Sequence, residues 1–180
     1  SMGHRNVQGL GYDDKNDIIY STEHGPIGGD EFNLNYKPNK LKVKNYGWPV
    51  SSYGEHYGGK IKKNEWKYKK APLKKSHSKH GFIEPIKYYV PSIGISEIIK
   101  VPKNFNRDFD NDFFISSMGK IKEEGDLSIH HIKVNYETKK IKEEDIIVIG
   151  ERIRDMKYIQ DLNKIILFVE NSPGIGILSF

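Results

Sequence analysis

The sequence predicts an all-β fold, and three observations point to it. Only 36% of the 180 residues are hydrophobic, whereas glycine, tyrosine, asparagine and β-branched residues are plentiful, as in proteins built of strands and polar loops. Helical periodicity is weak throughout, and short β-rich runs recur instead. A unit of strand, polar turn and strand also repeats along the chain. We therefore expect one domain over residues 3–180.

The β-rich runs follow one another at short intervals. They cover residues 9–12, 17–22, 31–35, 86–90, 97–101, 112–117, 128–134, 145–149, 153–159, 164–170 and 176–180. The loops between them are rich in asparagine, aspartate, glycine and lysine. The longest connection, residues 45–85, lies between strands of the first group. It is expected to form a loop insertion on one face of the unit that these strands build.

The repeated unit predicts the architecture. LGYDDKNDIIYSTEHG, EIIKVPKNFNRDFDNDFFISSMGK and RDMKYIQDLNKIILFVENS each contain a strand, a polar turn and an apolar strand, and DEFNLN, LSIHHIKV and GIGILSF follow as third strands. Such units bury both faces when they stack around an axis as blades of a β-propeller. The chain holds two to three four-stranded blades by this reading, and propellers typically close with about four to eight. We expect about half a propeller, whose open edges favour a homodimer or association with a missing N-terminal half.

Composition also excludes several classes of site. No stretch approaches about 18 consecutive apolar residues, so no membrane span is expected, and no signal peptide is recognisable. Ser1 and Met2 look like a cloning remnant. Zero cysteines exclude disulfides, thiolate chemistry and cysteine-ligated metals.

A basic run lies at residues 60–79. It carries nine of the 29 lysine and arginine residues and one acid, Glu65, with Trp66 and Tyr68 interleaved. Such a run could bind nucleic acid or another polyanion. It is also what a solvated loop insertion of a lysine-rich protein looks like. No nucleic-acid-binding motif accompanies it, which favours the loop.

The stretch EHGPIGGDE, at residues 23–31, is the best candidate for a site. It is a loop between two predicted strands, and its three glycines and proline allow a bent backbone that exposes carbonyl oxygens. Carboxylates and carbonyls are the ligands that calcium prefers. The alternative is an ordinary acidic hairpin turn, with Glu31 as an exposed carboxylate at a strand start.

Five ordered segments carry a resemblance to a known family. They are GHRNVQGL, EHGPIGGDE, NYGWP with SSYGEHY, EPIKYYVPSIGIS, and ERIRD. Their order and spacing resemble the carboxyl-terminal half of soluble quinoprotein aldose dehydrogenases, the glucose/sorbosone dehydrogenase family. The resemblance implies a six-bladed β-propeller that binds pyrroloquinoline quinone (PQQ) and calcium. It also implies a periplasmic or secreted protein that oxidises an aldose sugar at C1 to the lactone.

The resemblance assigns cofactor contacts residue by residue. Arg5 and Asn6, Tyr57, Ser117 and Met118, and Arg152, Ile153 and Arg154 match positions that contact the cofactor. A guanidinium pairs well with the carboxylates of PQQ, and alternation on a strand places Arg152 and Arg154 on one side and Ile153 on the other. The structural alternatives are surface arginines paired with Glu151 and Asp155, and a Tyr57 that packs on Trp48. Where some relatives have a lysine after the Ser117 strand, this chain offers Gly119 or Lys120.

The resemblance also implies two calcium sites. Glu31 and Tyr46, the latter through its backbone carbonyl, match the ligands of a structural ion. The carbonyls of Gly25 and Pro26 match those of an ion held against the cofactor.

No histidine of this chain inherits the catalytic role. His4 and His24 lie in motifs, His77 and His80 lie in the basic loop without metal-like partners, and the adjacent His130 and His131 should point to opposite faces of a strand. In the family the general base lies upstream of GHRN, so we expect the chain alone to be inactive. A different class of function stays open, namely a non-catalytic propeller module that binds a protein, glycan or polyanion. The set Arg5, Asn6, Arg152 and Arg154 favours the quinone site.

Overall fold

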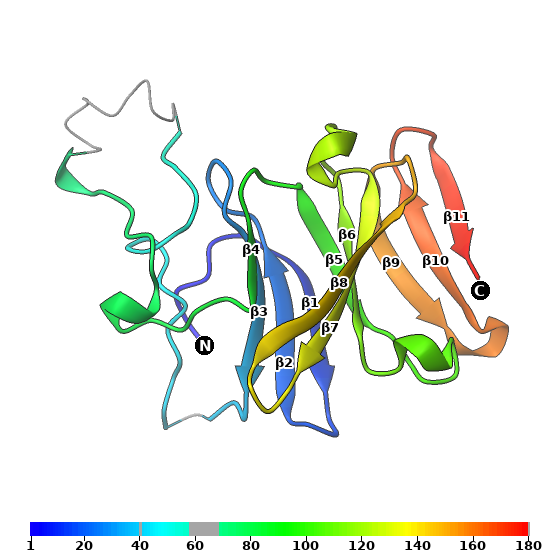
Figure 1. Ribbon diagram of the computed structural model, residues 1–180, viewed down its shortest axis with the longest axis horizontal. Coiled ribbons are helices and arrows are strands. Elements are labelled where there is room, and N and C mark those ends of the chain that lie inside the picture. The colour runs from blue at the N-terminus through cyan, green and yellow to red at the C-terminus, as the bar shows by residue number, and fades with distance from the viewer. Residues whose placement is uncertain (40, 58–68, 180) are drawn as a thin grey trace.

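The structure, a computed structural model, describes residues 1–39, 41–57 and 69–179. Three antiparallel sheets stand side by side in chain order (Figure 1). The first contains β1 (Val7–Asp13), β2 (Ile18–Glu23), β3 (Asp30–Tyr36) and β4 (Lys87–Tyr89); the second contains β5 (Ile95–Lys100), β6 (Phe113–Ser117), β7 (Ser128–Asn135) and β8 (Lys140–Val148); the third contains β9 (Ile153–Ile159), β10 (Lys164–Val169) and β11 (Gly174–Leu178). The all-β, partial-propeller prediction is confirmed.

Each run predicted as a strand overlaps a strand of the structure, with one large difference in length. β8 begins at Lys140, whereas the sequence indicated only residues 145–149. Residues 140–144, KIKEE, carry almost no apolar signal, and they are a strand because they pair with β7 along its length. Backbone pairing at an exposed edge leaves little trace in the side chains. The third sheet has three strands among the described residues.

Two hydrophobic cores join the sheets. Between the first and second sheets, Phe32 and Leu34 pack with Phe113 and Ile132, and none of the four is more than 4% exposed. Between the second and third sheets, the core consists mainly of Phe114, Ile129, Met156, Ile165 and Leu167. Adjacent residues Phe113 and Phe114 thus serve opposite cores, as alternation along a strand requires. Each interior sheet face is therefore buried against the next sheet.

The innermost strands start at a common end. β1 contacts β5, and β5 contacts β9. Two buried hydroxyls link the sheets near this end: Thr22 Oγ1, close to the end of β2, donates to the Ser96 carbonyl at 2.5 Å, and Ser96 Oγ donates to the Ile153 carbonyl at 2.6 Å. We call this end, at the top of Figure 1, the upper end. Loops that precede β1, β5 and β9, or follow β2, β6 and β10, meet there.

The long insertion connects β3 to β4 of the first sheet along the chain. In space it extends away from that sheet, at the left of Figure 1. A short 3-10 helix, η2 (Ser78–His80), is part of it. Residues 60–68 of the basic run are outside the described residues. Within the described part of the chain, no helix combines the length and hydrophobicity needed to cross a membrane.

Candidate functional site

Arg5 lies at the upper end, just before β1, and its guanidinium is held on several sides. Nη1 donates to the His24 carbonyl at 2.9 Å and Nη2 to the Tyr57 hydroxyl at 2.5 Å. The rings of Trp48 and Tyr57 flank the guanidinium carbon at 5.3 and 5.8 Å, which favours a cation between them. Three of the five motifs therefore meet at Arg5, its own included, and Tyr57 contacts this arginine across 52 residues of sequence.

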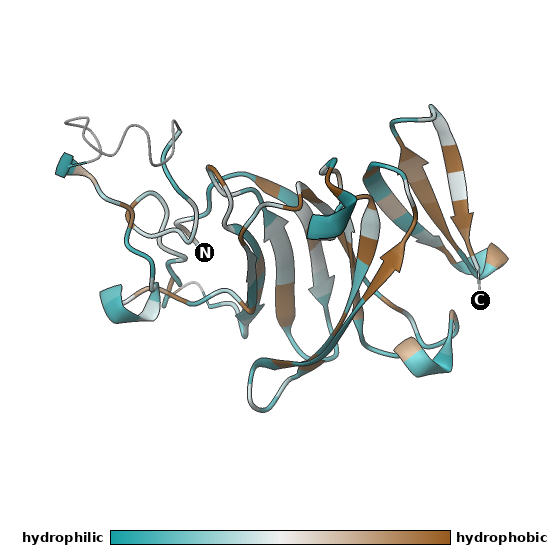
Figure 2. Ribbon diagram, turned by 45° about the horizontal axis from the view of Figure 1, so that its top comes forward, coloured by the Kyte–Doolittle hydropathy of each residue, from teal (hydrophilic) through white to brown (hydrophobic). Residues whose placement is uncertain are grey.

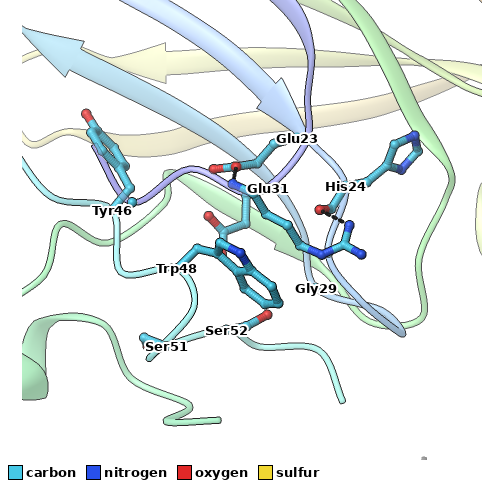
Figure 3. Close-up of a pocket in the computed structure, with 11 residues that line it drawn as sticks. Glu23, His24, Gly29, Glu31, Tyr46, Trp48, Ser51 and Ser52 are labelled. Carbon is cyan, nitrogen blue, oxygen red and sulfur yellow. Dashed lines mark hydrogen bonds between the residues drawn. The ribbon is translucent and has the colours of Figure 1, made fainter. Parts of the chain in front are cut away.

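Glu23 and Glu31 form a buried carboxylate pair. They are direct partners across β2 and β3, and their exposed fractions are 3% and 5%. One amide serves both, since Asn33 Nδ2 donates to Glu23 Oε1 at 2.8 Å and to Glu31 Oε2 at 3.2 Å. Burial, together with the charge of Glu23, raises the pKa of Glu31 to about 8. The alternative in which Glu31 is an exposed carboxylate is wrong. Figure 3 shows the pair near Trp48 and Tyr46.

His77 completes this cluster, and no sequence motif pointed to it. Its side chain is 1% exposed, and Nδ1 is 2.9 Å from the Tyr46 carbonyl. Because a carbonyl only accepts, Nδ1 carries the hydrogen. Burial lowers the pKa of His77, so Nε2 presents a lone pair 3.3 Å from Glu31 Oε1. Neither His77 Nε2 nor Asn33 Oδ1 has a hydrogen-bond partner among the described residues.

Asp30 ties the EHGPIGGDE loop to the second sheet. Its buried carboxylate accepts hydrogen bonds from Gly25 N at 3.1 Å, Ser92 Oγ at 2.5 Å and Ile95 N at 3.0 Å. Burial acts to raise the pKa of Asp30, but these bonds and nearby His24 lower it overall. The loop is folded so tightly that a Cβ on Gly25 would lie 2.1 Å from the Gly28 carbonyl oxygen. Gly25 is therefore restricted to glycine.

The turn after β6 offers mainly backbone to the upper end. Ser117 is fully buried, and its hydroxyl bonds to Ser128 within the sheet. Met118 is 8% exposed, while Lys120 is open to solvent. The Asp126 carboxylate accepts the Ile121 N–H at 2.7 Å and fixes the turn. The expected contacts of Ser117 and Met118 would come from their main chain.

Arg152 and Arg154 alternate with Ile153 as expected. Ile153 is fully buried in the core, and both arginines reach the same carboxylate, that of Glu170, which directly follows β10. Arg152 Nη2 is 3.1 Å from Glu170 Oε2, and Arg154 Nε donates to Glu170 Oε1 at 2.7 Å. Their partner is thus neither Glu151 nor Asp155. These contacts, chiefly that with Arg154, lower the pKa of Glu170.

Comparison with known proteins identifies the family. The sequence model described as Glucose / Sorbosone dehydrogenase matches residues 1–178. The chain belongs to this family. It is 30% identical over 172 residues to an uncharacterized protein of Synechocystis sp., covering 96% of this chain and 36% of that protein. It is 29% identical over 157 residues to aldose sugar dehydrogenase YliI of Escherichia coli K12, covering 87% of this chain and 37% of that protein.

Solved structures of family members have the same fold. The apo-form of soluble aldose sugar dehydrogenase from Escherichia coli matches with a TM-score of 0.72 at 25% identity, over 97% of this chain and 44% of that one. A glucose dehydrogenase matches with a TM-score of 0.74 at 25% identity, over 99% and 45%. The PQQ-bound aldose sugar dehydrogenase of Streptomyces coelicolor matches with a TM-score of 0.54 at 22% identity, over 92% of this chain and 37% of that one. This match supports the fold. The chain thus spans about a third to under half the length of these relatives.

His4, His24, His130 and His131 also have structural partners. His4 Nδ1 is 3.3 Å from Glu23 Oε1, and His24 Nδ1 is 3.7 Å from Asp30 Oδ1. His130 packs on Tyr89 and His131 on Phe114, one toward each core, which confirms their opposite directions. Within the described residues, no group of three or more histidine, cysteine and acidic side chains could hold a metal unaided. Any ion here would need amide or carbonyl ligands as well.

Proposed function

We propose that the upper end of this chain is part of the PQQ- and calcium-binding site of a quinoprotein aldose dehydrogenase. The observation that carries the proposal is the meeting of Arg5, Trp48 and Tyr57 above a buried carboxylate pair. Family membership supports the sugar-oxidising chemistry, and a relative in the same fold was solved with PQQ bound. Because the chain covers only part of each relative, the complete reaction needs elements beyond those described.

The residues present fit a divalent cation. Two carboxylates, Glu23 and Glu31, are buried side by side with one amide between them, which is costly without a compensating positive charge. Asn33 Oδ1 is a buried oxygen without a donor among the described residues, and carboxylate, amide and carbonyl oxygens are the ligands of calcium. We assign Glu31 and the Tyr46 carbonyl to one ion, and the carbonyls of Gly25 and Pro26 to a second ion at the cofactor.

The residues also fit a planar tricarboxylate. Arg5 is fixed by two hydrogen bonds and two rings, so its remaining N–H groups are oriented without further loss of side-chain freedom. Asn6 is exposed beside it. Arg152 and Arg154 lie at the same end on the third sheet and can exchange Glu170 for a cofactor carboxylate. Tyr57 and the backbone of Ser117, Met118 and Ile153 complete the assigned contacts.

PQQ, when bound, is the oxidant that would accept a hydride from C1 of the sugar. The roles proposed for this chain's residues are to bind and orient: Arg5 and Asn6 would donate to the quinone side of PQQ, and Arg152 and Arg154 would hold its carboxylates. No histidine of the chain is assigned as the base that removes the sugar hydroxyl proton. We place that group outside this chain and propose a periplasmic or secreted location.

Calorimetric titration of PQQ into the calcium-loaded protein tests the proposal. We expect binding by the unmodified chain and its loss in the double variant Arg152→Ala, Arg154→Ala. Arg107→Ala is the matched control, since this exposed arginine in η3 (Arg107–Phe109) follows β5 at the opposite end of the sheets. Equal affinity in all three proteins would contradict the assigned arginines.

A second candidate is a non-catalytic module that binds a protein or glycan. The pairing of both Arg152 and Arg154 with Glu170 favours it, since the pair is satisfied without any cofactor. Absence of PQQ binding, with calcium still raising the melting temperature, would favour this candidate.

Binding of a polyanion to residues 60–79 predicts salt-sensitive retention on heparin. Retention that is unaffected by salt would exclude polyanion binding.

A further inference from the structure

We propose that His77 Nε2 and Glu31 Oε1 bind one divalent metal ion that accepts nitrogen as well as oxygen ligands, such as Zn²⁺. The two atoms are 3.3 Å apart. The described residues themselves bury the place where they meet, since His77 is 1% and Glu31 5% exposed. The inference does not depend on PQQ.

His77 is buried although its surroundings in the chain are polar. It directly precedes η2, in an insertion that is largely hydrophilic in Figure 2. The Tyr53 ring stacks on the imidazole, with 5.3 Å between the ring centroids and 10° between the planes. The main-chain N–H groups of His80 and Phe82 both donate to the His77 carbonyl at 3.0 Å. The ring and the backbone of His77 are therefore both held in place.

The two ring nitrogens of His77 have different roles. Nδ1–H donates to the Tyr46 carbonyl at 2.9 Å, which leaves a lone pair on Nε2 of the neutral ring. Histidines that bind metals usually have this arrangement, because the hydrogen bond from one nitrogen fixes the ring and makes the other nitrogen a better ligand. Nε2 has no hydrogen-bond partner among the described residues. A buried nitrogen of this kind is costly unless a donor or a cation meets it.

The contact between His77 and Glu31 has the geometry of two ligands of one ion. Zinc lies about 2.0–2.1 Å from nitrogen and about 2.0–2.2 Å from oxygen ligands, so two such atoms at a tetrahedral angle are about 3.3–3.5 Å apart. The observed separation of Nε2 and Glu31 Oε1 is 3.3 Å. The two atoms nevertheless make no hydrogen bond, because the oxygen lies off the direction of the lone pair. An ion on that lone pair would contact both atoms.

The cluster around Glu31 is rich in negative charge. Besides burial, the charges of Glu23 and Glu84 act to raise the pKa of Glu31. A divalent cation would offset this charge in a place that is largely shielded from water. Asn33 Oδ1 is a further buried oxygen of the cluster that has no partner in the described part of the chain. Amide oxygen and water would complete the coordination of the ion.

This ion differs from the calcium ion assigned to Glu31 and the Tyr46 carbonyl. The two nitrogens of an imidazole point in roughly opposite directions, so an ion on Nε2 lies on the far side of the ring from the Tyr46 carbonyl, which is bonded to Nδ1. The ligands also differ, because calcium prefers oxygen atoms, whereas imidazole nitrogen suits zinc and similar transition metals. Since Glu31 would serve both ions, they should compete for the protein.

Calorimetric titration of Zn²⁺ into the chelator-treated 180-residue chain tests the inference, and we expect one zinc ion per chain. His77→Asn should weaken binding by at least about tenfold, because the asparagine amide can still donate to the Tyr46 carbonyl but nothing replaces Nε2. Glu31→Gln should weaken binding to a similar degree. His80→Asn is the matched control, since His80 is exposed in η2, and it should bind zinc like the unmodified chain. Urea denaturation without metal shows whether the variants are folded.

X-ray absorption spectroscopy of the zinc-loaded, unmodified chain examines the ligands without any variant, and it should show scattering by one imidazole. Absence of this scattering, or equal zinc affinity in His77→Asn and the unmodified chain, would overturn the inference. The contact between His77 and Glu31 would then be a shared proton.

Titration of calcium separates a ligand from a residue that only holds the Tyr46 carbonyl. His77→Asn should leave calcium binding unchanged, and equal losses of zinc and calcium binding would overturn the inference. PQQ binding is measured separately, so the metal site and the proposed cofactor site can each fail alone.

Discussion

Asp30 provides the sharpest test of how the candidate site is held together. Replacing it by asparagine keeps its shape but turns one carboxylate oxygen into an NH2 group. In either amide orientation a backbone N–H, that of the half-buried Gly25 or of the buried Ile95, then faces another donor. An unsatisfied buried donor costs about 1–3 kcal/mol, and the remaining bonds lose the strength that the carboxylate charge gives them. We expect Asp30→Asn to lower the free energy of unfolding by about 2–4 kcal/mol.

Urea denaturation followed by far-UV circular dichroism measures this effect. Asp14→Asn is the matched control, because Asp14 is exposed and its carboxylate accepts a hydrogen bond from the adjacent Lys15 N–H. The lowered pKa of Asp30 adds a pH signature. Its stabilising contribution is present above the unfolded value near 3.8 and is lost as the pH falls through the folded pKa. A loss for Asp30→Asn within about 0.5 kcal/mol of the control would refute the role assigned to Asp30.

Three further predictions concern Glu31, Phe114 and Glu170. The pKa of Glu31 is raised from 4.5 to about 8, so the folded state without calcium binds a proton that the unfolded state releases. Stability should therefore fall as the pH rises from about 4.5 to about 8, by at most about 5 kcal/mol; urea denaturation with a chelator measures this, and an equally steep fall in Glu31→Gln would contradict it. Phe114 is fully buried between the second and third sheets, so Phe114→Ala should cost about 3–5 kcal/mol in the same assay, and a loss below about 1 kcal/mol would mean that this contact is not a stable core. Glu170→Gln should free Arg152 and Arg154 and tighten PQQ binding in calorimetry; weaker binding would show that Glu170 orients the arginines.

Local sequence could predict most of the fold. Alternation of apolar and polar residues indicated the strands, and it placed Ile153 opposite to Arg152 and Arg154, and His130 opposite to His131. These properties depend on neighbours one or two residues away, which is why they can be read from the chain. β8 was underestimated because its first half is held by backbone pairing and has a charged surface.

The strands, their repeat and the motifs shared with glucose/sorbosone dehydrogenases are thus properties of the amino-acid sequence alone. Which side chains meet at the candidate site depends instead on how the sheets pack. His77, far along a polar insertion, lies against Glu31, and Asp30 reaches Ser92 and Ile95 of the next sheet. Such contacts join residues that are distant in the chain, and they form because sheet stacking brings the upper-end loops together. No local pattern of charge or periodicity encodes that proximity, since it arises from packing the sheets into one row.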